Sequence, residues 1–573
     1  MKHLQTYLFL ILLSLNCQAQ KFQLKISGNS PLETKKIDSL NYSTIHINTK
    51  SIENETNLIL EKLSKKGYTE SRLIELTKTN DSSYVANLKI GDKTKYIHIY
   101  IGINSQYKKL NLLDQKKDSL IMPYSEIEYF LNETLQKLEL RGYAFTKLKL
   151  KNITKKKDIL FAELEFETEN QRKINKIVIK QVNNHIDDFF PKGHLSQINR
   201  KYKDKTYNQK TVTLINKDFE NLGFATQIKY PEILFTKDST KIYIYLNKRK
   251  TNNFDGFIGF NNNTQNKIAL NGYLDLKLEN LLLTGEQFTL YWKSDEKKQK
   301  TFKTSLEIPY ILNSPIGLRA QFDIFKQDSI YQNTKTAIDI GYYSNYKTRF
   351  YLGYQSTTSS DIQNTNTNFI SDYKNSFITT NMEYSQYNYN NTLFPSKTIL
   401  ILKLGTGKRE TNFKDQNSPT NKQSFINLNI LHLFTINEKN FINIKNESYY
   451  LKSATYNLNE LYRYGGINSI RGFKENSLQA NIMSALITEY RYLITPQLYI
   501  HSILDYSILK DPFNTEKNNK TTKILGTGLG IGALTKGGLI KLSIANGSRK
   551  NEEFKFYNTI IHISYNVKFW MRA

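Results

Sequence analysis

The chain has 573 residues, and its 80 Lys and Arg residues outnumber 52 Asp and Glu residues to give a formal net charge of +28. A charge of this size can indicate nucleic-acid binding. Lys and Asn are abundant throughout, however, so compositional bias explains the charge better and no nucleic-acid partner is expected. The only cysteine, Cys17, lies in the N-terminal leader, which excludes disulfides, zinc–thiolate sites and a cysteine nucleophile from the rest of the chain.

The first 19 residues, MKHLQTYLFLILLSLNCQA, have the pattern of a secretory signal peptide. Lys2 is followed by an apolar run from Tyr7 to Leu15, and cleavage is expected after Ala19. Lipidation of Cys17 would require a small residue before it, and Asn16 stands there instead. Beyond the signal peptide, no apolar run reaches the roughly 18 residues that would predict a transmembrane helix.

The rest of the chain combines polar character with many aromatic residues. The full sequence includes 39 Tyr and 31 Phe, although its mean hydropathy is −0.53. For an exported chain, this combination is typical of a transmembrane β-barrel, whose strands present only every second residue to lipid.

Three segments of the first half share the pattern of an amphipathic helix that ends in a glycine and an aromatic residue. They are SIENETNLILEKLSKKGY, YSEIEYFLNETLQKLELRGY and NQKTVTLINKDFENLGF. Their ends, Gly67-Tyr68, Gly142-Tyr143 and Gly223-Phe224, predict a left-handed cap at each glycine. The aromatic residue would then dock back on the helix.

Alternating segments such as DILFAELEF, KINKIVIK and TKIYIYLNK lie between these helices and predict strands. The order predicts a β-α-α-β-β unit that occurs three times, as small α+β domains over residues 20–93, 94–172 and 173–252. These units resemble POTRA domains, whose exposed strand edges can accept an added strand from an extended peptide. The alternative is that the domains are only spacers.

Residues 253–573 change to long alternating segments separated by Asn, Lys, Gly and Ser. The last one, TIIHISYNVKF, places Ile561, Ile563 and Tyr565 opposite His562 and Ser564. One apolar face and one polar face are what a water-filled barrel in lipid requires. A soluble sandwich would alternate as well, but it would not need such long strands or so many aromatics. About sixteen such segments predict a closed antiparallel transmembrane barrel.

A late loop of this region, YRYGGINSIRGFKEN, carries the motif Ile470-Arg471-Gly472-Phe473. An arginine in a loop is ordinarily a solvated surface charge. POTRA-like domains followed by a barrel with this motif, however, resemble the BamA/TamA superfamily of outer-membrane assembly proteins. The resemblance covers nearly the whole mature chain. It implies that the loop folds back into the barrel and that its arginine pairs with acidic residues on the inner wall.

The resemblance identifies Asp505, in HSILDYSIL, as the first partner of Arg471, and Glu489, in LITEYRYLI, as the second. The family pattern FxDxG reads Ile503-Leu504-Asp505-Tyr506-Ser507 here, so the acid is kept while the flanking Phe and Gly are replaced. This departure affects the packing around the pair.

Glycines occupy every second position of ILGTGLGIGAL: Gly526, Gly528, Gly530 and Gly532. Glycines on one face of a strand indicate the close approach of another backbone, which the inward-folded loop would provide. A phosphate-binding loop would need a helix directly after the glycines, but a turn, TKGG, follows them.

The first and last strands of the barrel would meet at a seam. Gly256, Ile258 and Gly259 lie in the first strand, FDGFIGFNNN, and Phe569 lies near the end of the last one. Glycine weakens a strand, so the seam is expected to be the place where the barrel opens sideways.

The resemblance implies a protein of the outer membrane with its N-terminal domains in the periplasm, and a role in protein insertion or translocation. Its partners would be unfolded outer-membrane or secreted proteins, outer-membrane lipid and periplasmic accessory proteins. The alternative is a two-partner-secretion transporter, a class that has two such domains and an N-terminal plug helix. Here KFQLKISG, after the signal peptide, predicts a strand. A passive porin would leave the repeated domains unexplained.

The sequence gives no indication of catalysis. The eight His are scattered, and neither HExxH nor GxSxG occurs. An enzymatic activity, a cofactor and a metal site are therefore not expected.

Overall fold

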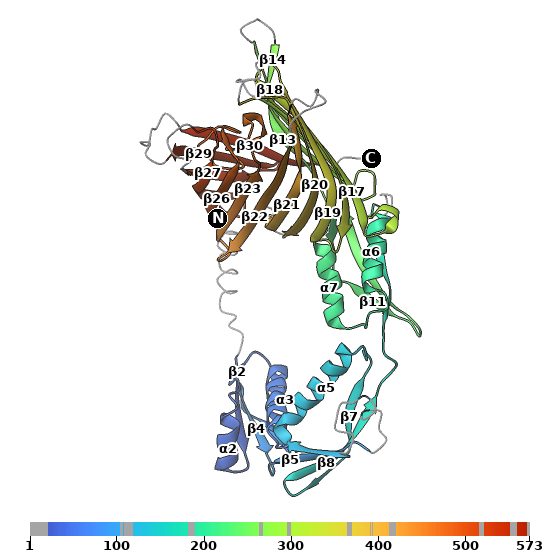
Figure 1. The fold of residues 1–573 in the computed structure, drawn as a ribbon. Helices are drawn as coiled ribbons and strands as arrows, with labels where there is room; N and C mark the ends of the chain where they lie inside the picture. The colour runs from blue at the N-terminus through green and yellow to red at the C-terminus, as the bar shows by residue number, and fades with distance from the viewer. Residues whose placement is uncertain are drawn as a thin grey trace, which may run out of the picture. The chain divides into compact units, whose positions relative to one another are not determined.

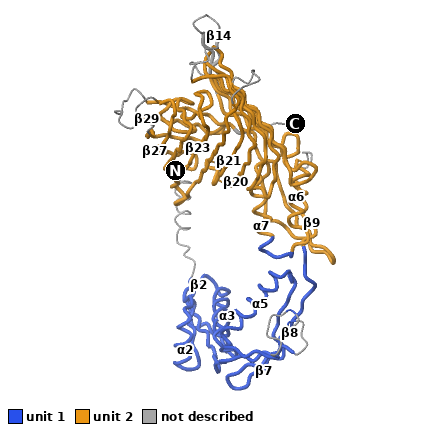
Figure 2. Tube along the Cα trace, in the orientation of Figure 1, with its two compact units in different colours: residues 1–173, 206–211 blue, residues 174–205, 212–573 orange. Residues whose placement is uncertain are grey.

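A computed structural model describes residues 21–102, 118–181, 189–262, 268–294, 299–363, 369–389, 393–411, 420–514, 521–549 and 559–569, with Tyr107, Leu110 and Asn391 between them. The predicted signal peptide and the segment from Trp570 to Ala573 lie outside these residues. Within them, no helix combines the length and the apolar character needed to cross a membrane. The chain forms two compact units: residues 1–173 with 206–211, and residues 174–205 with 212–573 (Figure 2).

The first unit contains two small α/β domains. The first has a four-stranded sheet in the order β2-β1-β4-β3, and the second has one in the order β6-β5-β8-β7. The elements of the first domain are β1 (Phe22–Gly28), α2 (Pro31–Asp38), β2 (Ile45–His46), α3 (Thr49–Lys65), β3 (Arg72–Asn80) and β4 (Ser83–Lys89). Those of the second are β5 (Tyr96–Tyr100), β6 (Ser119–Pro123), η1 (Tyr124–Glu126), α5 (Ile127–Leu140), β7 (Lys147–Lys156) and β8 (Ile159–Glu167).

The third α/β domain has a related plan, in which each of the other strands pairs with the last one. Its elements are β9 (Ile174–Gln181), α6 (Lys192–Tyr202), α7 (Gln209–Glu220), β10 (Ala225–Gln227), β11 (Glu232–Phe235) and β12 (Thr240–Lys248). In all three domains the first strand runs parallel to the last: β1 with β4, β5 with β8 and β9 with β12. The prediction of repeated small α+β domains is therefore confirmed.

The predicted glycine caps are present at two of the three helices. Gly67 and Gly142 have φ angles of +100° and +94°, and the N–H of the following tyrosine donates back to the helix, at 3.0 Å in both cases. The prediction is wrong for Gly223, which does not adopt the left-handed region. A Cβ there would lie 3.0 Å from the Glu279 carboxylate of the barrel, so this glycine provides a close approach instead of a cap.

Sixteen strands close an antiparallel barrel, as predicted (Figure 1). They are β13 (Asn252–Asn262), β14 (Ile268–Glu279), β15 (Gln287–Ser294), β16 (Gln299–Ile308), β17 (Ile316–Gln327), β18 (Tyr331–Tyr343), β19 (Thr348–Asp361), β20 (Tyr373–Tyr387), β21 (Ser396–Thr411), β22 (Thr420–Thr435), β23 (Asn440–Lys452), β26 (Ile482–Thr495), β27 (Leu498–Lys510), β28 (Thr522–Leu534), β29 (Leu539–Arg549) and β30 (Ile560–Phe569).

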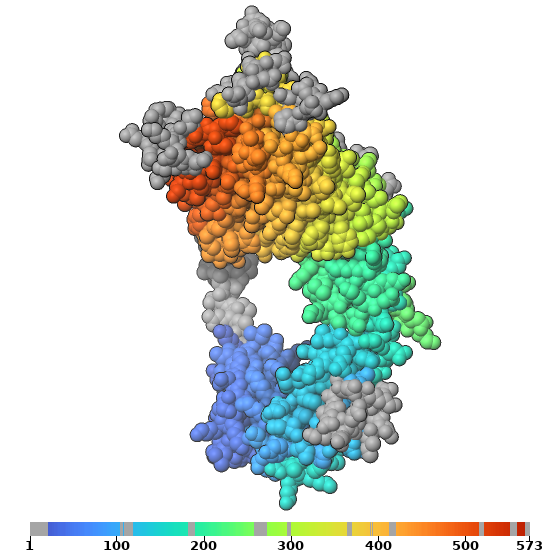
Figure 3. Space-filling view, viewed as in Figure 1, coloured from blue at the N-terminus to red at the C-terminus, as the bar shows by residue number. Residues whose placement is uncertain are grey.

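The two faces of the barrel wall differ in polarity. On β18, Ile338 and Ile340 are 60% and 58% exposed, whereas Asp339 between them is fully buried. On β20, Ile378 is 61% exposed and Thr379 is fully buried. An apolar outer face around a polar interior is the arrangement of barrels that span membranes. The side chains of the middle strands form a continuous surface on the face shown in Figure 3.

The third domain packs directly on barrel turns through His194 of α6. The His194 ring lies 4.6 Å from that of Tyr310 and 5.6 Å from that of Tyr346, between centroids. Phe190 and Phe224 of the third domain enclose it from the other side. No described residue offers a hydrogen-bond partner to either ring nitrogen. Burial, with a smaller contribution from the charge of Arg349, lowers the pKa of His194 to about 3.

This burial predicts a pH dependence of the joint between the third domain and the barrel. Because an unfolded histidine has a pKa of about 6.5, the unfolded state binds more protons between pH 3 and 6.5, and stability falls as the pH drops through that window. The loss between pH 7 and pH 5 should be about 2 kcal/mol. Urea unfolding in detergent micelles at both pH values measures it.

His194→Phe should remove this loss, because a phenyl ring fills the aromatic cage and does not titrate. His98→Phe, on the sheet of the second domain, is the control and should keep it. An unchanged pH dependence in His194→Phe would show that His194 does not control the joint.

Candidate functional site

The loop between β23 and β26 folds into a hairpin of its own. Its strands are β24 (Tyr462–Tyr464) and β25 (Leu478–Ala480), which pair with each other and not with the barrel sheet. The hairpin carries the tip, residues 465–477, which includes the predicted motif. Gly465, Gly466 and Gly472 in this tip have φ angles of +103°, +100° and +85°, a region that side-chain-bearing residues rarely adopt.

The base of the loop is held by inward-facing polar side chains of several strands. The side-chain amide of Asn459 donates to Ser359 Oγ of β19 at 2.7 Å, and the Asn459 backbone carbonyl accepts from the Asn333 amide of β18 at 2.6 Å. Glu460 pairs with Arg409 of β21, and both side chains are 2% exposed. Contacts with the inner faces of separate strands locate the loop inside the barrel.

Arg471 lies against both acids that the sequence analysis associated with it. Its Nε and Nη2 donate to the two oxygens of Asp505 on β27, at 2.8 and 2.6 Å. Its Nη1 donates to Glu489 of β26, and its backbone N–H donates to Asp505 Oδ2 at 3.0 Å. The planar fork of a guanidinium suits a bidentate contact with one carboxylate together with a contact to a second.

The charges of this network are enclosed. The side chain of Arg471 is 3% exposed, that of Asp505 is 0% exposed and that of Glu489 is 16% exposed. Glu489 also accepts from Arg491 on its own strand, at 2.5 Å. Two arginines therefore share Glu489, whereas within the described part of the chain Asp505 pairs with Arg471 alone. Removing one partner of such an enclosed pair lowers the free energy of unfolding by about 3–5 kcal/mol.

The β26–β27 ladder is interrupted beside Arg471. Residue pairing runs to Thr488 with Leu504 and resumes at Arg491 with His501. Where the pairing stops, side chains bind the backbone groups of Thr488 instead. Arg471 Nη2 donates to the Thr488 carbonyl at 3.3 Å, and Asp505 Oδ1 accepts from the Thr488 N–H at 3.3 Å. The arginine therefore binds backbone groups of the wall as well as its acids.

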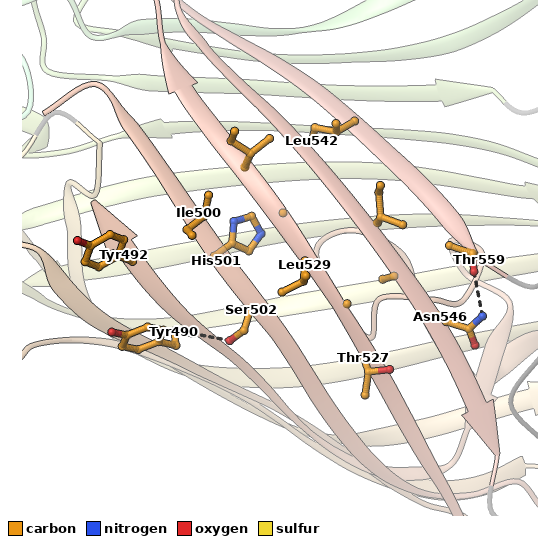
Figure 4. A pocket seen from close by; sticks show the side chains of 15 residues that line it. Tyr490, Tyr492, Ile500, His501, Ser502, Thr527, Leu529, Leu542, Asn546 and Thr559 are labelled. Carbon is orange, nitrogen blue, oxygen red and sulfur yellow. Dashed lines mark hydrogen bonds between the residues drawn. The ribbon is translucent and has the colours of Figure 1, made fainter. Parts of the chain in front are cut away.

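The outer side of the same wall is hollowed into an apolar groove of about 710 Å³. Figure 4 shows Tyr490, Tyr492, Ile500 and Leu529 around it. Two hydrogen bonds lie at its edge: Ser502 Oγ accepts from the Tyr490 N–H at 3.2 Å, and the amide of Asn546 donates to Thr559 at 3.1 Å (Figure 4). The Arg471 network thus lies on the inner side of a thin stretch of wall.

The other motif residues pack around the arginine. Ile470 is fully buried in a cluster with Tyr464, Leu478, Met483 and others beneath the hairpin. The Phe473 ring lies against Gly547 of β29, where a Cβ would be 2.4 Å from the ring.

The four glycines of β28 have different neighbours. A Cβ at Gly526 would lie 2.3 Å from the Arg471 carbonyl oxygen, so this glycine does admit the loop backbone. At Gly530 and Gly532 the space is filled by the rings of His501 and Tyr499, and at Gly528 by the backbone of β29. The loop backbone therefore explains one of these four glycines, and side chains of β27 explain two.

The seam between β13 and β30 is short. It pairs Asn252 with Phe569, Asn253 with Lys568, Phe254 with Val567 and Asp255 with Asn566, and then it stops. By contrast, β20 and β21 pair along the whole of β20, from Tyr373 to Tyr387.

Gly256, the first residue beyond the seam, packs on β14, where a Cβ would lie 2.4 Å from the Tyr273 carbonyl oxygen. Asp255 Oδ1 accepts from the N–H of Tyr565 at 3.3 Å. The side chains of Ile258 and Phe569, and the surroundings of Gly259, lie outside the described part of the chain.

Sequence reasoning missed several residues of the site. Gly547, which receives the Phe473 ring, is a lone glycine inside a strand, and such a glycine signals a close approach. Arg491 lies two residues from Glu489 and could have been considered as its second cation. Glu475 contacts Tyr291 and Lys293 of β15, a pairing that no local pattern indicates. Among the described residues, no group of His, Asp and Glu is arranged to hold a metal ion.

No family model and no curated protein matches the sequence. Among solved structures, CdiB from Acinetobacter baumannii is similar with a TM-score of 0.50 and 11% identity, over 83% of this chain and 91% of that one. CdiB from Escherichia coli has a TM-score of 0.49 and 10% identity, over 91% and 98% of the two chains. BamA from Haemophilus ducreyi lacking POTRA domains 1–3 has a TM-score of 0.48 and 15% identity, over 82% and 99%. The likeness to the first CdiB shows a shared fold.

The Arg471 network predicts a strong coupling between Arg471 and Asp505. Arg471→Ala should lower the free energy of unfolding in detergent micelles by about 3–5 kcal/mol, because it leaves a buried carboxylate without its cation. In an Asp505→Asn background the same substitution should cost far less. The difference between the two costs is the coupling energy.

Arg463→Ala is the matched control. Arg463 lies in the same hairpin, but it forms no ion pair with a described carboxylate, and its guanidinium lies over the rings of Phe325 and Tyr331 instead. It should show no coupling to Asp505. An equal cost of Arg471→Ala in both backgrounds would mean that the arginine acts elsewhere.

Proposed function

We propose that the protein is an outer-membrane assembly factor of the BamA/TamA superfamily. It receives unfolded outer-membrane or secreted clients on its periplasmic α/β domains. It then passes them into the lipid through the seam between β13 and β30. In this role it is a transport protein and not an enzyme.

The observation that carries the proposal is the contrast between the seam and the rest of the barrel. Four residue pairs join β13 to β30, whereas the ladders on either side of the seam run further. Breaking a ladder exposes backbone groups that lipid cannot satisfy, so a short ladder is the least costly place to open. A client strand that pairs with the freed edges would satisfy those groups again.

The α/β domains support the receipt of extended clients. In the first domain β3 lies at the edge of its sheet, and most of its residues are exposed. In the second domain β7 is an edge strand. A free strand edge presents unpaired N–H and C=O groups, which are what an extended peptide needs in order to add as a further strand.

A two-partner-secretion transporter is the second candidate, because the fold is shared with CdiB from Acinetobacter baumannii. Such a protein would move its partner through the lumen instead of the seam. The hairpin β24–β25 and the Arg471 network occupy that lumen, and enclosed ion pairs resist separation. We therefore favour passage at the seam.

A crosslink across the seam separates the two candidates. Phe254 and Val567 are directly paired, and Cβ atoms at such positions are about 4.5–5.5 Å apart. In cells depleted of the native protein, Phe254→Cys/Val567→Cys should form a disulfide and lower the level of client proteins in the outer membrane. A reductant should restore that level.

The control is Ile378→Cys/Thr406→Cys, which crosslinks the paired strands β20 and β21 away from the seam. It should leave the level of client proteins unchanged. Full activity of the quantitatively crosslinked seam variant would rule out lateral opening and favour passage through the lumen.

A further inference from the structure

The tip of the loop lies across the inner side of the seam. Arg471 binds β26 and β27, and its carbonyl lies over Gly526 of β28. Gly472, the next residue, packs against Gly547 of β29, where its Cβ would lie 2.3 Å from the backbone nitrogen. Glu475 then reaches β15. In strand order, β30, β13 and β14 lie between β29 and β15, so these residues contact the barrel wall on both sides of the seam.

Glu475 contacts the part of the barrel on the β13 side of the seam, which is called the N-terminal wall and begins with β13, β14 and β15. Its Oε1 accepts from the Tyr291 hydroxyl at 2.9 Å, and its Oε2 accepts from Lys293 Nζ. One more basic group, Lys303 of β16, is close enough to interact with its charge. The acid is therefore held by charge complementarity with the two lysines of β15 and β16.

The dimensions allow residues 471–475 to form a bridge across the seam, from β29 to β15. Strands of a sheet are about 4.8 Å apart, so β29 and β15 are separated by about 19 Å of wall. The chain from Gly472 to Glu475 covers up to about 10 Å. The side chains of Glu475 and Lys293, which extend towards each other, cover the rest.

We propose that Glu475 is a positioning residue that fixes the loop to the N-terminal wall, so that residues 471–475 hold the seam closed from inside. This inference rests on the proposed opening of the seam. The seam cannot widen while both ends of the bridge are attached, because Arg471 holds one wall and Glu475 holds the other. Opening therefore requires the release of one end.

The Glu475 end is the one that releases. The side chains of Glu475 and Lys293 are 27% and 29% exposed, so water competes for both charges and the pair is weak. Arg471 and Asp505 are 3% and 0% exposed, and their separation would leave an uncompensated charge inside the wall. The bridge thus has a permanent anchor at Arg471 and a reversible anchor at Glu475.

The test is the conductance of the full-length protein in planar lipid bilayers, which does not depend on client assembly. Glu475→Gln and Lys293→Gln should each raise the fraction of time in the high-conductance state several-fold. The double variant should open no more than either single variant, because both remove the same contact.

Asp323→Asn is the matched control. Asp323 pairs with Lys335 on the adjacent strand at 2.7 Å, with 24% and 34% exposure, so its loss removes a charge of similar exposure from the lumen without freeing the loop. It should leave the open fraction unchanged. The proposal is overturned if the two single effects multiply in the double variant, or if Asp323→Asn opens as much as Glu475→Gln. Each of these outcomes leaves the seam-crosslink test of the proposed function unaffected.

Discussion

Arg471 is a permanently charged group that has almost no contact with water, so its position depends on Asp505 and Glu489. A guanidinium cannot be neutralised at any accessible pH, and taking it away from its acids would leave charges of both signs enclosed. The loop that carries it is therefore fixed at one point of the wall. Gly526 and Gly547 remove the side chains that would otherwise obstruct the loop.

The two sides of the seam are attached to different parts of the chain. On the N-terminal side, barrel turns hold the third domain through the aromatic cage around His194 and through contacts such as the Asn280 amide with the Phe189 carbonyl, at 3.0 Å. On the C-terminal side, β26 to β29 hold the loop through Arg471 and Phe473. At the seam, four residue pairs, the hydrogen bond from the Tyr565 N–H to Asp255 and the Glu475 contact join these two sides. A force on the third domain is therefore transmitted first to the N-terminal wall, and the seam is where the two walls separate.

Much of this fold could be predicted because its periodicities are local. Alternation of polar and apolar residues marks each barrel strand, and three helices that end in a glycine and an aromatic residue mark the domains. The interpretation of Gly223 failed because the same Gly-aromatic pair can serve a close approach to a distant segment. Only the neighbour, here Glu279, distinguishes the two uses.

The candidate site was accessible from sequence only where strand order determined neighbours. Asp505 and Glu489 lie on the strands that follow the loop, so the resemblance could associate them with Arg471. Tyr291 and Lys293 lie 184 and 182 residues away from Glu475, and no periodic pattern relates positions so far apart. The length of the seam could not be predicted either. The alternation of polar and apolar residues indicates which face of the sheet a residue occupies, but not over how many residues two strands pair.

The most direct test of the account is hydrogen–deuterium exchange of the full-length protein in lipid nanodiscs, compared between the native chain and Arg471→Ala. If the enclosed arginine holds the loop across the seam, its loss should speed exchange in residues 252–262 and 560–569, while β20 and β21 exchange as before. Seam strands that exchange at the same rate in both proteins would contradict the central claim that Arg471 keeps the seam closed.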